Sequence, residues 1–340
     1  MFKLIDNPET MAKLPELEET NLANYLDRQE LEVLLNNGQI HSFSTGDVIL
    51  QQGKKAEGIY IIISGNVVVS ARSMGQGMTN IEVLKPGNFL NEISFIEKGA
   101  SPTSYVASNN VQCLFINSVH FEMLSLYFPE TKYKILYAIT KQICSRLKAM
   151  HGKVTTLITQ SEIPGLSFLG RVVDSLNQPK QVASINESML ERLQKKSLFK
   201  SFSKDELHEL FQHTVLLEAA KNCKLIHVGE KSASCYIVIQ GAVQSSIMQD
   251  NKLAKLSVIG PGALFASIAC IDNDSSFTIT FVTCEQAILL KISESELDAI
   301  RNNNPRLWYK LFDLICISLV ALEKSINKLD VRLHIETYNR

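Results

Sequence analysis

The sequence reads YIIISGNV at residues 60–67 and YIVIQGAV at residues 236–243, which lie 176 positions further along the chain. Tyrosine, glycine and valine hold the same places in both stretches, and apolar residues, most of them β-branched, lie between the tyrosine and the glycine. A β-branched run that ends at a glycine predicts a strand followed by a tight turn. Because the pattern recurs at a fixed distance, we expect the chain to contain one structural unit twice.

The same shift aligns other parts of the two halves. Residues 26–31 fall on residues 202–207, and each stretch holds a capping residue, Asp27 or Ser203, three positions before a glutamate. This spacing predicts a helix that begins with a capping box. The shift changes to 175 at Pro86 and later returns to 176, which one residue gained inside a loop would explain.

The periodicity changes along each repeat. After the opening helix come short β-branched or apolar runs, punctuated by Gly, Asn and Pro, at residues 47–50, 60–63, 67–69 and 113–116. Their spacing is typical of a small antiparallel barrel or jelly roll. Apolar residues then recur every three or four positions between Ile143 and Leu157, which predicts a helix with one buried face. The expected fold class is therefore α+β, with two barrel units flanked by helices.

The length of 340 residues suits two domains, and a hydrophobic content of 45% is enough to build their cores. We expect an N-terminal extension, a first unit, a partly helical linker and a second unit that ends in a long helix. Their predicted bounds are residues 1–25, 26–157, 158–197 and 198–340.

The last helix carries an apolar stripe with alternating spacings of three and four. Its members are Phe312, Ile315, Leu319, Leu322, Ile326, Leu329 and Leu333. Three unbroken heptads are typical of a coiled-coil seam, so the stripe predicts association and a homodimer. The alternative is that the stripe packs on the barrel of its own chain. Trp308, the only tryptophan, precedes the stripe and is expected to anchor the core.

Composition limits the partners and the compartment. The 34 basic and 35 acidic residues give a net charge of −1, which does not support nucleic-acid binding. The N-terminus has no apolar signal region, and the most apolar stretch, residues 307–321, contains Lys310 and Asp313. We therefore expect no membrane span and a cytoplasmic location. The seven cysteines include no CxxC pair, which favours buried, reduced thiols over a metal site.

The order of these motifs resembles the cyclic nucleotide-binding domain family twice, over residues 26–150 and 202–333. The resemblance is to catabolite activator-like proteins and to the regulatory subunits of cyclic-nucleotide-dependent kinases. It implies a ligand site in a phosphate-binding cassette, which reads Phe-Gly-Glu and has an Arg nine residues after the Glu, followed by T/A-A-T-V. In such a cassette backbone N–H groups and the Arg hold the cyclic phosphate, while the Glu accepts from the ribose hydroxyl.

Both cassettes depart from the family pattern. In the first, Asn91 replaces the Gly, Glu92 is retained, and Ser101 stands where the Arg is expected. If this unit holds a ligand, the resemblance points to Asn91, Glu92, Ser101 and Thr103 as its contacts. In the second, Ala266, Ser267 and Phe277 occupy the Gly, Glu and Arg positions, and residues 262–284 contain no Lys or Arg. We therefore predict degenerate cassettes that do not bind cyclic nucleotide in the usual mode.

Two functions remain after an enzyme is excluded. No His-x-His pair, nucleophile motif or P-loop is present, so we expect no catalytic residues, no metal and no cofactor. The preferred hypothesis is a regulatory or scaffolding protein that acts through contacts with a protein partner. The alternative is a sensor in which the first unit binds cAMP, cGMP or cyclic di-GMP in a non-standard mode.

Overall fold

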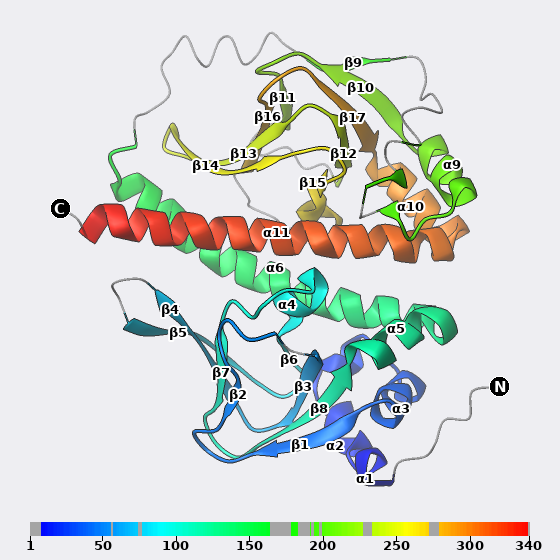
Figure 1. The fold of residues 1–340 in the computed structure, drawn as a ribbon, viewed down its shortest axis with the longest axis vertical. Coiled ribbons are helices and arrows are strands. Elements are labelled where there is room, and N and C mark those ends of the chain that lie inside the picture. The colour runs from blue at the N-terminus through cyan, green and yellow to red at the C-terminus, as the bar shows by residue number, and fades with distance from the viewer. Residues whose placement is uncertain are drawn as a thin grey trace. The chain divides into compact units, whose positions relative to one another are not determined.

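A computed structural model gives the fold of both repeats (Figure 1). The residues that it describes are 8–55, 57–73, 77–163, 178–182, 191, 194–196, 199–226, 233–271 and 279–338. The chain divides into two compact units, Met1–Gln142 and Ile143–Arg340, so the division falls inside helix α6 (Pro129–Gln160). The domain bounds expected from the sequence stay a prediction, and each unit is described by itself below.

The first unit opens with helices and continues into two antiparallel sheets. The helices are α1 (Pro8–Met11), α2 (Leu14–Glu18), η1 (Asn21–Asn24) and α3 (Arg28–Asn36). One sheet, in spatial order, contains β1 (Gln39–Phe43), β8 (Val111–Asn117), β3 (Gly58–Ser64) and β6 (Phe89–Leu90). The other contains β2 (Val48–Leu50), β7 (Ser104–Ala107), β4 (Val67–Ser73) and β5 (Gly77–Leu84). Helices α4 (Glu92–Glu97) and α5 (Ser118–Tyr127) precede α6.

The second unit repeats this order. It runs through α9 (Lys204–Gln212), β10 (Val215–Ala219), β11 (Lys224–Ile226), β12 (Cys235–Gln240), β13 (Val243–Gln249), β14 (Lys252–Ile259), β15 (Leu264–Phe265), η3 (Ser267–Cys270), β16 (Ile279–Thr283), β17 (Ala287–Ile292), α10 (Glu294–Asn303) and α11 (Pro305–Tyr338). Its sheets have the orders β11-β16-β13-β14 and β15-β12-β17-β10-β9, where β9 is Lys180–Gln181. The predicted fold class, two antiparallel barrel units with a long C-terminal helix, is confirmed.

The glycine of the repeated stretch has the same structural role in both units. Gly65 and Gly241 follow β3 and β12 with φ of 83° and 81°, a region that L-residues rarely adopt. A Cβ atom would also collide with the backbone of the neighbouring turn, at the carbonyl oxygens of Asn110 and Gln286. The repeat in the sequence therefore reflects a tight turn that only glycine fits.

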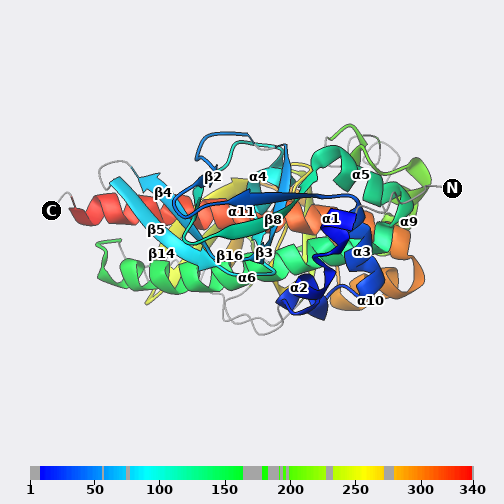
Figure 2. The same cartoon turned by 90° about the horizontal axis from the view of Figure 1, so that it is seen from below.

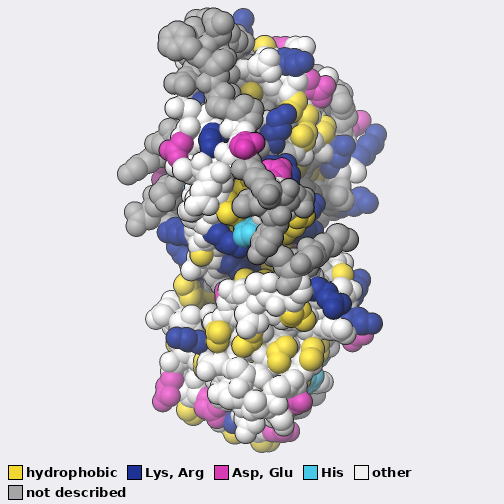
Figure 3. All heavy atoms as spheres, turned by 90° about the vertical axis from the view of Figure 1, so that its left-hand side faces the viewer, with side chains coloured by type: hydrophobic (Ala, Val, Ile, Leu, Met, Phe, Trp, Pro, Cys, Tyr) yellow, Lys and Arg dark blue, Asp and Glu magenta, His cyan; other side chains and the backbone are white. Residues whose placement is uncertain are grey.

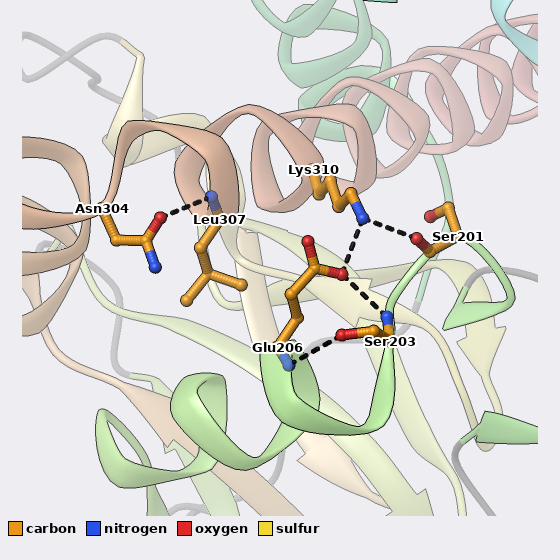
Figure 4. A network of polar contacts seen from close by, with 6 residues as sticks. All are labelled: Ser201, Ser203, Glu206, Asn304, Leu307 and Lys310. Carbon is orange, nitrogen blue, oxygen red and sulfur yellow. Dashed lines mark hydrogen bonds and ion pairs between the residues drawn. The ribbon is translucent and has the colours of Figure 1, made fainter. Parts of the chain in front are cut away.

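The capping boxes predicted from the sequence are present at α3 and α9. In the second unit Ser203 Oγ accepts from the backbone N–H of Glu206, while the Glu206 carboxylate accepts from that of Ser203 (Figure 4). Lys310 of α11 adds an ion pair, with Nζ 2.6 Å from Glu206 Oε2, and donates to the carbonyl of Ser201 at 2.8 Å. Each capping box thus fixes the first turn of its helix. In the second unit, Lys310 also joins the capping box of α9 to the long helix α11.

The first unit holds the equivalent ion pair, with Lys134 Nζ 2.8 Å from Glu30 Oε1. Lys134 and Lys310 lie 176 positions apart, as do Glu30 and Glu206. This hydrogen-bonded ion pair raises the pKa of Lys134. Burial alone would raise the pKa of Glu206, but the hydrogen bonds from Lys310 and Ser203 outweigh it and lower that pKa.

The apolar stripe of α11 is buried within the chain. Six of its seven members have exposed fractions of 3% or less, and Leu322 is half-buried. The last part of α6, which belongs to the second unit, runs beside α11 (Figures 1 and 2). It buries an apolar face of its own, formed by Ile143, Leu147, Val154 and Ile158.

Two ion pairs set the register of these helices. Arg146 Nε and Nη2 donate to the two carboxylate oxygens of Glu323 at 2.8 and 3.1 Å, and the side chains of Arg146 and Glu323 are only 11% and 6% exposed. Lys153 pairs with Asp330 at 2.8 Å in a more exposed position. Both pairs join residues 177 positions apart, so the helices run parallel. The stripe is therefore buried within its own chain, in which α11 contacts β14, β15 and η3 and is joined to α6 by the two ion pairs. The homodimer stays a prediction. The residues expected to form its seam are already largely buried within the single chain.

Other expectations concern the core and the membrane. Trp308 is buried and lies 5.7 Å from Phe312 between ring centroids, as expected for a core anchor. Five of the seven cysteines are buried, Cys270 and Cys284 are half-exposed, and none of the seven forms a disulfide. Burial raises the pKa of Cys113 to about 12, so this thiol stays protonated. In the part of the chain that the structure describes, no helix is long and apolar enough to cross a membrane.

Candidate functional site

The first cassette begins where β6 ends and α4 starts. Asn91 lies between them with φ of 69°, in the left-handed region where glycine carries no penalty and asparagine is tolerated. Its side chain is buried, donates to the carbonyl oxygen of Gly58 at 3.0 Å and accepts from the Ser94 hydroxyl. Asn91 thus has the left-handed backbone conformation that suits a glycine, and its side-chain amide forms hydrogen bonds within the protein.

Glu92 is the first residue of α4 and is completely buried. A carboxylate at the start of a helix is stabilised by the N–H groups of the first turn. In the role that the family resemblance implies, its oxygens would face a ribose hydroxyl in an accessible pocket. With an exposed fraction of 0% the side chain has no surface open to solvent in this structure.

The expected Arg position carries no charge and is tied into the fold. Ser101 is buried, and its hydroxyl donates to the carbonyl oxygen of Thr103 at 2.7 Å. Its backbone N–H and carbonyl bond to Lys54 and Gly53 at 2.8 and 2.9 Å. Thr103 is half-buried beside it, just before β7. Both groups of Ser101 that could reach an anion, the hydroxyl and the N–H, therefore donate to the protein.

The interior of the first barrel is filled by an aromatic side chain that the sequence analysis did not single out. Tyr105 occupies the last position of the family's T/A-A-T-V segment, where the pattern has the smaller Val. Its side chain is 3% exposed and belongs to a core built from both sheets. The other members of this core are Ile49, Ile62, Val67, Val69, Leu84, Leu90, Ala107, Val111 and Cys113. The signal in the sequence was a bulky residue at a position where the family has a small one.

The second cassette has the same backbone and a different chemistry. Ala266 has φ of 65°, and no side-chain hydrogen bond caps η3 at this residue. Ser267, at the family's Glu position, is buried, and its hydroxyl donates to the Ser318 hydroxyl of α11 at 2.9 Å. Phe265 stacks on Tyr236 with centroids 5.3 Å apart. Phe277, at the family's Arg position, lies outside the described residues.

The electrostatics of the first cassette do not favour an anion. Lys98 is the C-cap of α4, and its Nζ lies 3.3 Å from the Glu122 carboxylate, with both side chains largely exposed. The lysine that could supply positive charge therefore faces solvent and an acid. The predicted ligand contacts form two short stretches, Asn91-Glu92 at the start of α4 and Ser101 to Thr103 before β7. A ligand-binding role for these residues stays a prediction.

The similarity to known proteins extends over both repeats. The sequence profile of the family described as "Cyclic nucleotide-binding domain" matches residues 40–126 and 216–304, slightly more than half of the chain. The cAMP-activated global transcriptional regulator CRP of Salmonella typhimurium is 27% identical over 156 residues, which cover 44% of this chain and 68% of that protein. The cGMP-dependent protein kinase of Plasmodium berghei is 20% identical over 290 residues, covering 85% of this chain and 27% of the kinase.

Solved structures with similarity to this chain include the regulatory domain of Toxoplasma gondii PKA with cAMP. That structure has 12% sequence identity and a TM-score of 0.32, with 89% of this chain and 95% of that chain covered. The regulatory subunit of a cAMP-independent protein kinase A from Trypanosoma cruzi, bound to guanosine, has 14% identity and a TM-score of 0.31. The alignment covers 89% of this chain and 87% of the Trypanosoma cruzi chain.

Proposed function

Because the chain belongs to the cyclic nucleotide-binding domain family, we propose that it is a non-enzymatic regulatory protein whose two domains act through contacts with another protein. In this proposal neither cassette binds cyclic nucleotide in the usual mode. The observation that carries the proposal is the Arg position of the first cassette, where the buried Ser101 donates its hydroxyl to the carbonyl of Thr103.

The energy of phosphate recognition supports the proposal. A hydrogen bond to a charged group contributes about 1.5–3 kcal/mol, and a bidentate arginine supplies more than one. A phosphate that left water without such a partner would be a buried charge with too few donors. Tyr105 adds a steric argument, because its ring belongs to the core between the two sheets. The uncharged Ser101 and the packed Tyr105 therefore both support a first domain that does not bind cyclic nucleotide in the usual mode.

Exposed apolar side chains in the first domain support a protein partner. Met78, Ile81 and Val83 of β5 are 62%, 47% and 54% exposed, and β5 is the last strand of its sheet. The face of the first domain shown in Figure 3 carries hydrophobic side chains among polar ones. An edge strand with exposed apolar side chains is a surface on which a second chain can add. We place the contact with the partner on this strand.

A sensor function of the first domain is the second candidate. It is favoured by Glu92, which the first cassette retains, and by the φ of 69° at Asn91, which preserves the backbone of a glycine-containing cassette. The second domain has the same backbone conformation at Ala266 but no carboxylate at Ser267. A sensor would therefore use the first domain alone.

Calorimetry on the whole chain with cAMP, cGMP and cyclic di-GMP separates the two candidates. We expect no binding tighter than about 1 mM, because Ser101 stands at the Arg position of the first cassette and residues 262–284 of the second contain no Lys or Arg. Micromolar binding that Glu92→Ala abolishes would overturn the proposal. Glu97→Ala is the matched control, since Glu97 is an exposed glutamate on the same helix. Partner binding is tested by capture from native cell extract, where Val83→Lys is expected to release proteins that the wild-type chain retains.

A further inference from the structure

The second domain contains a cavity of about 510 Å³ that none of the described cassette residues lines. Its walls come from β9, β10, β12 and β17 of one sheet, from β11 of the other, and from the ends of α9 and α10. It therefore opens at the place where the two sheets separate. The volume lies within the range of sites that bind small molecules.

Two lysines give the cavity its charge. Lys224 of β11 and Lys291 of β17 both line it and are half-buried, and neither forms an ion pair with any residue that the structure describes. Lys291 Nζ lies 5.9 Å from the ring centroid of Tyr236, a cation–π contact that leaves its hydrogen bonds available.

One carboxylate among the lining residues is already engaged. Glu296 is the acidic residue of the lining, and its Oε2 is 2.6 Å from Nδ1 of His213. It is therefore held at the wall by the imidazole, while the charges of the two lysines are not neutralised by it. Gln178, Gln181 and Gln212 are among the other polar residues that line the cavity.

The first domain has no lysine at either equivalent position. Val48 and Phe115 lie 176 positions before Lys224 and Lys291. Phe115 packs on Tyr60 and His41 with centroid distances of 4.7 and 5.2 Å, so an aromatic cluster fills the space. At both positions the second domain therefore places a lysine where the first domain has an uncharged, apolar residue. The second domain alone thus presents two cationic residues at this place in its barrel.

We propose that this cavity binds a small organic oxyanion, carrying a phosphate or more than one carboxylate, through Lys224 and Lys291. The three glutamines contact the uncharged part of the ligand. The site is separate from both cassettes, so the second domain would respond to an effector other than a cyclic nucleotide held in the family's usual way. This inference stands whether or not the first domain binds a protein partner.

The test is calorimetry on the full chain with three probes: AMP, inorganic phosphate and citrate. We expect AMP or citrate to bind, and the comparison between them identifies the phosphate or carboxylate chemistry. Lys291→Met and Lys224→Met should each weaken binding by roughly tenfold or more, because each removes a charge-assisted hydrogen bond. Lys221→Met, which removes the same charge from an exposed position, should leave the affinity unchanged.

Several results would overturn the proposal. These are no binding of any probe at about 10 mM, an equal loss in Lys221→Met, or full affinity in Lys291→Phe, which carries the first domain's residue. A measurement on the wild-type chain covers the case in which a variant fails to fold. Reductive methylation followed by mass spectrometry should show protection of Lys224 and Lys291 by the ligand, and unchanged modification of Lys221. Equal modification with and without ligand contradicts the site.

Discussion

The two domains use nearly the same backbone and differ in what they place on it. Turn glycines, capping boxes and the glutamate–lysine pair recur at a spacing of 176. The cassettes differ, with Asn91 hydrogen-bonded to Gly58 in one and Ala266 without a side-chain bond in the other. The barrel interiors differ as well, since Phe115 packs against aromatic rings and Lys291 lines a cavity. Positions that determine backbone geometry are therefore shared, whereas those that would determine ligand chemistry have diverged.

The largest loss of stability is expected at two positions where the sequences of α6 and α11 differ between the repeats. Arg146 and Glu323 are equivalent to Leu322 and Leu147, so each helix carries a charge where the other has leucine. Arg146→Ala removes both hydrogen bonds from the guanidinium to the buried Glu323 carboxylate and should lower the free energy of unfolding by about 3–5 kcal/mol. Urea unfolding followed by the fluorescence of Trp308, which lies in the same unit, measures this loss.

Two variants make that prediction specific. Lys153→Ala removes the more exposed pair with Asp330 and should cost at most about 1 kcal/mol. The double variant Arg146→Leu with Glu323→Leu makes the two helices alike at these positions and should recover the stability lost in Arg146→Ala. Equal losses in Arg146→Ala and Lys153→Ala would show that burial of the first pair does not matter.

Glycine substitutions in the two cassettes should have opposite signs. Ala266→Gly relieves a left-handed conformation and should raise the free energy of unfolding by about 1 kcal/mol. Asn91→Gly relieves the same conformation but removes the buried bond to Gly58, so we expect a net loss of about 1 kcal/mol. Thermal unfolding, followed by circular dichroism and by Trp308 fluorescence, measures both. A gain in both variants would mean that the Asn91 side chain contributes nothing.

The smallest effect is a difference in pH dependence between the two capping pairs. Glu206 has a lowered pKa, so its contribution to stability is complete above the ordinary carboxyl value and is lost as pH falls through the lowered pKa. Lys134 has a raised pKa, so its contribution is complete below the ordinary lysine value and is lost as pH rises through the raised pKa.

Hydrogen exchange of α3 and α9 across the pH range detects these contributions. Lys310→Met should flatten the acid dependence of α9, and Lys134→Met should flatten the alkaline dependence of α3. Each partly exposed pair contributes less than about 1 kcal/mol, so both variants should stay folded at neutral pH. If both variants keep the pH dependence of the wild-type chain, the ion pairs are not the cause of that dependence.

Much of the fold could be predicted because its signals are local. Capping boxes depend on residues three apart, as at Asp27 and Glu30, and Gly65 reports the φ of a single turn. The candidate site was predictable only in its losses, because a missing arginine can be read at Ser101. The structural consequences of this loss could not be predicted from the sequence. The hydrogen bond of the Ser101 hydroxyl and the packing of Tyr105 depend on partners that only folding brings together.

The sequence alone determined the repeat, the strand and helix order, the turn glycines and the absence of an arginine at position 101. The tertiary structure decided what covers the stripe of α11, how the first barrel is filled, and that Lys224 and Lys291 share one cavity. Periodicity shows that a helix face is buried, but it cannot show whether the same chain or a second copy buries it. A cavity likewise depends on elements far apart in the chain, and only their packing places its lysines together.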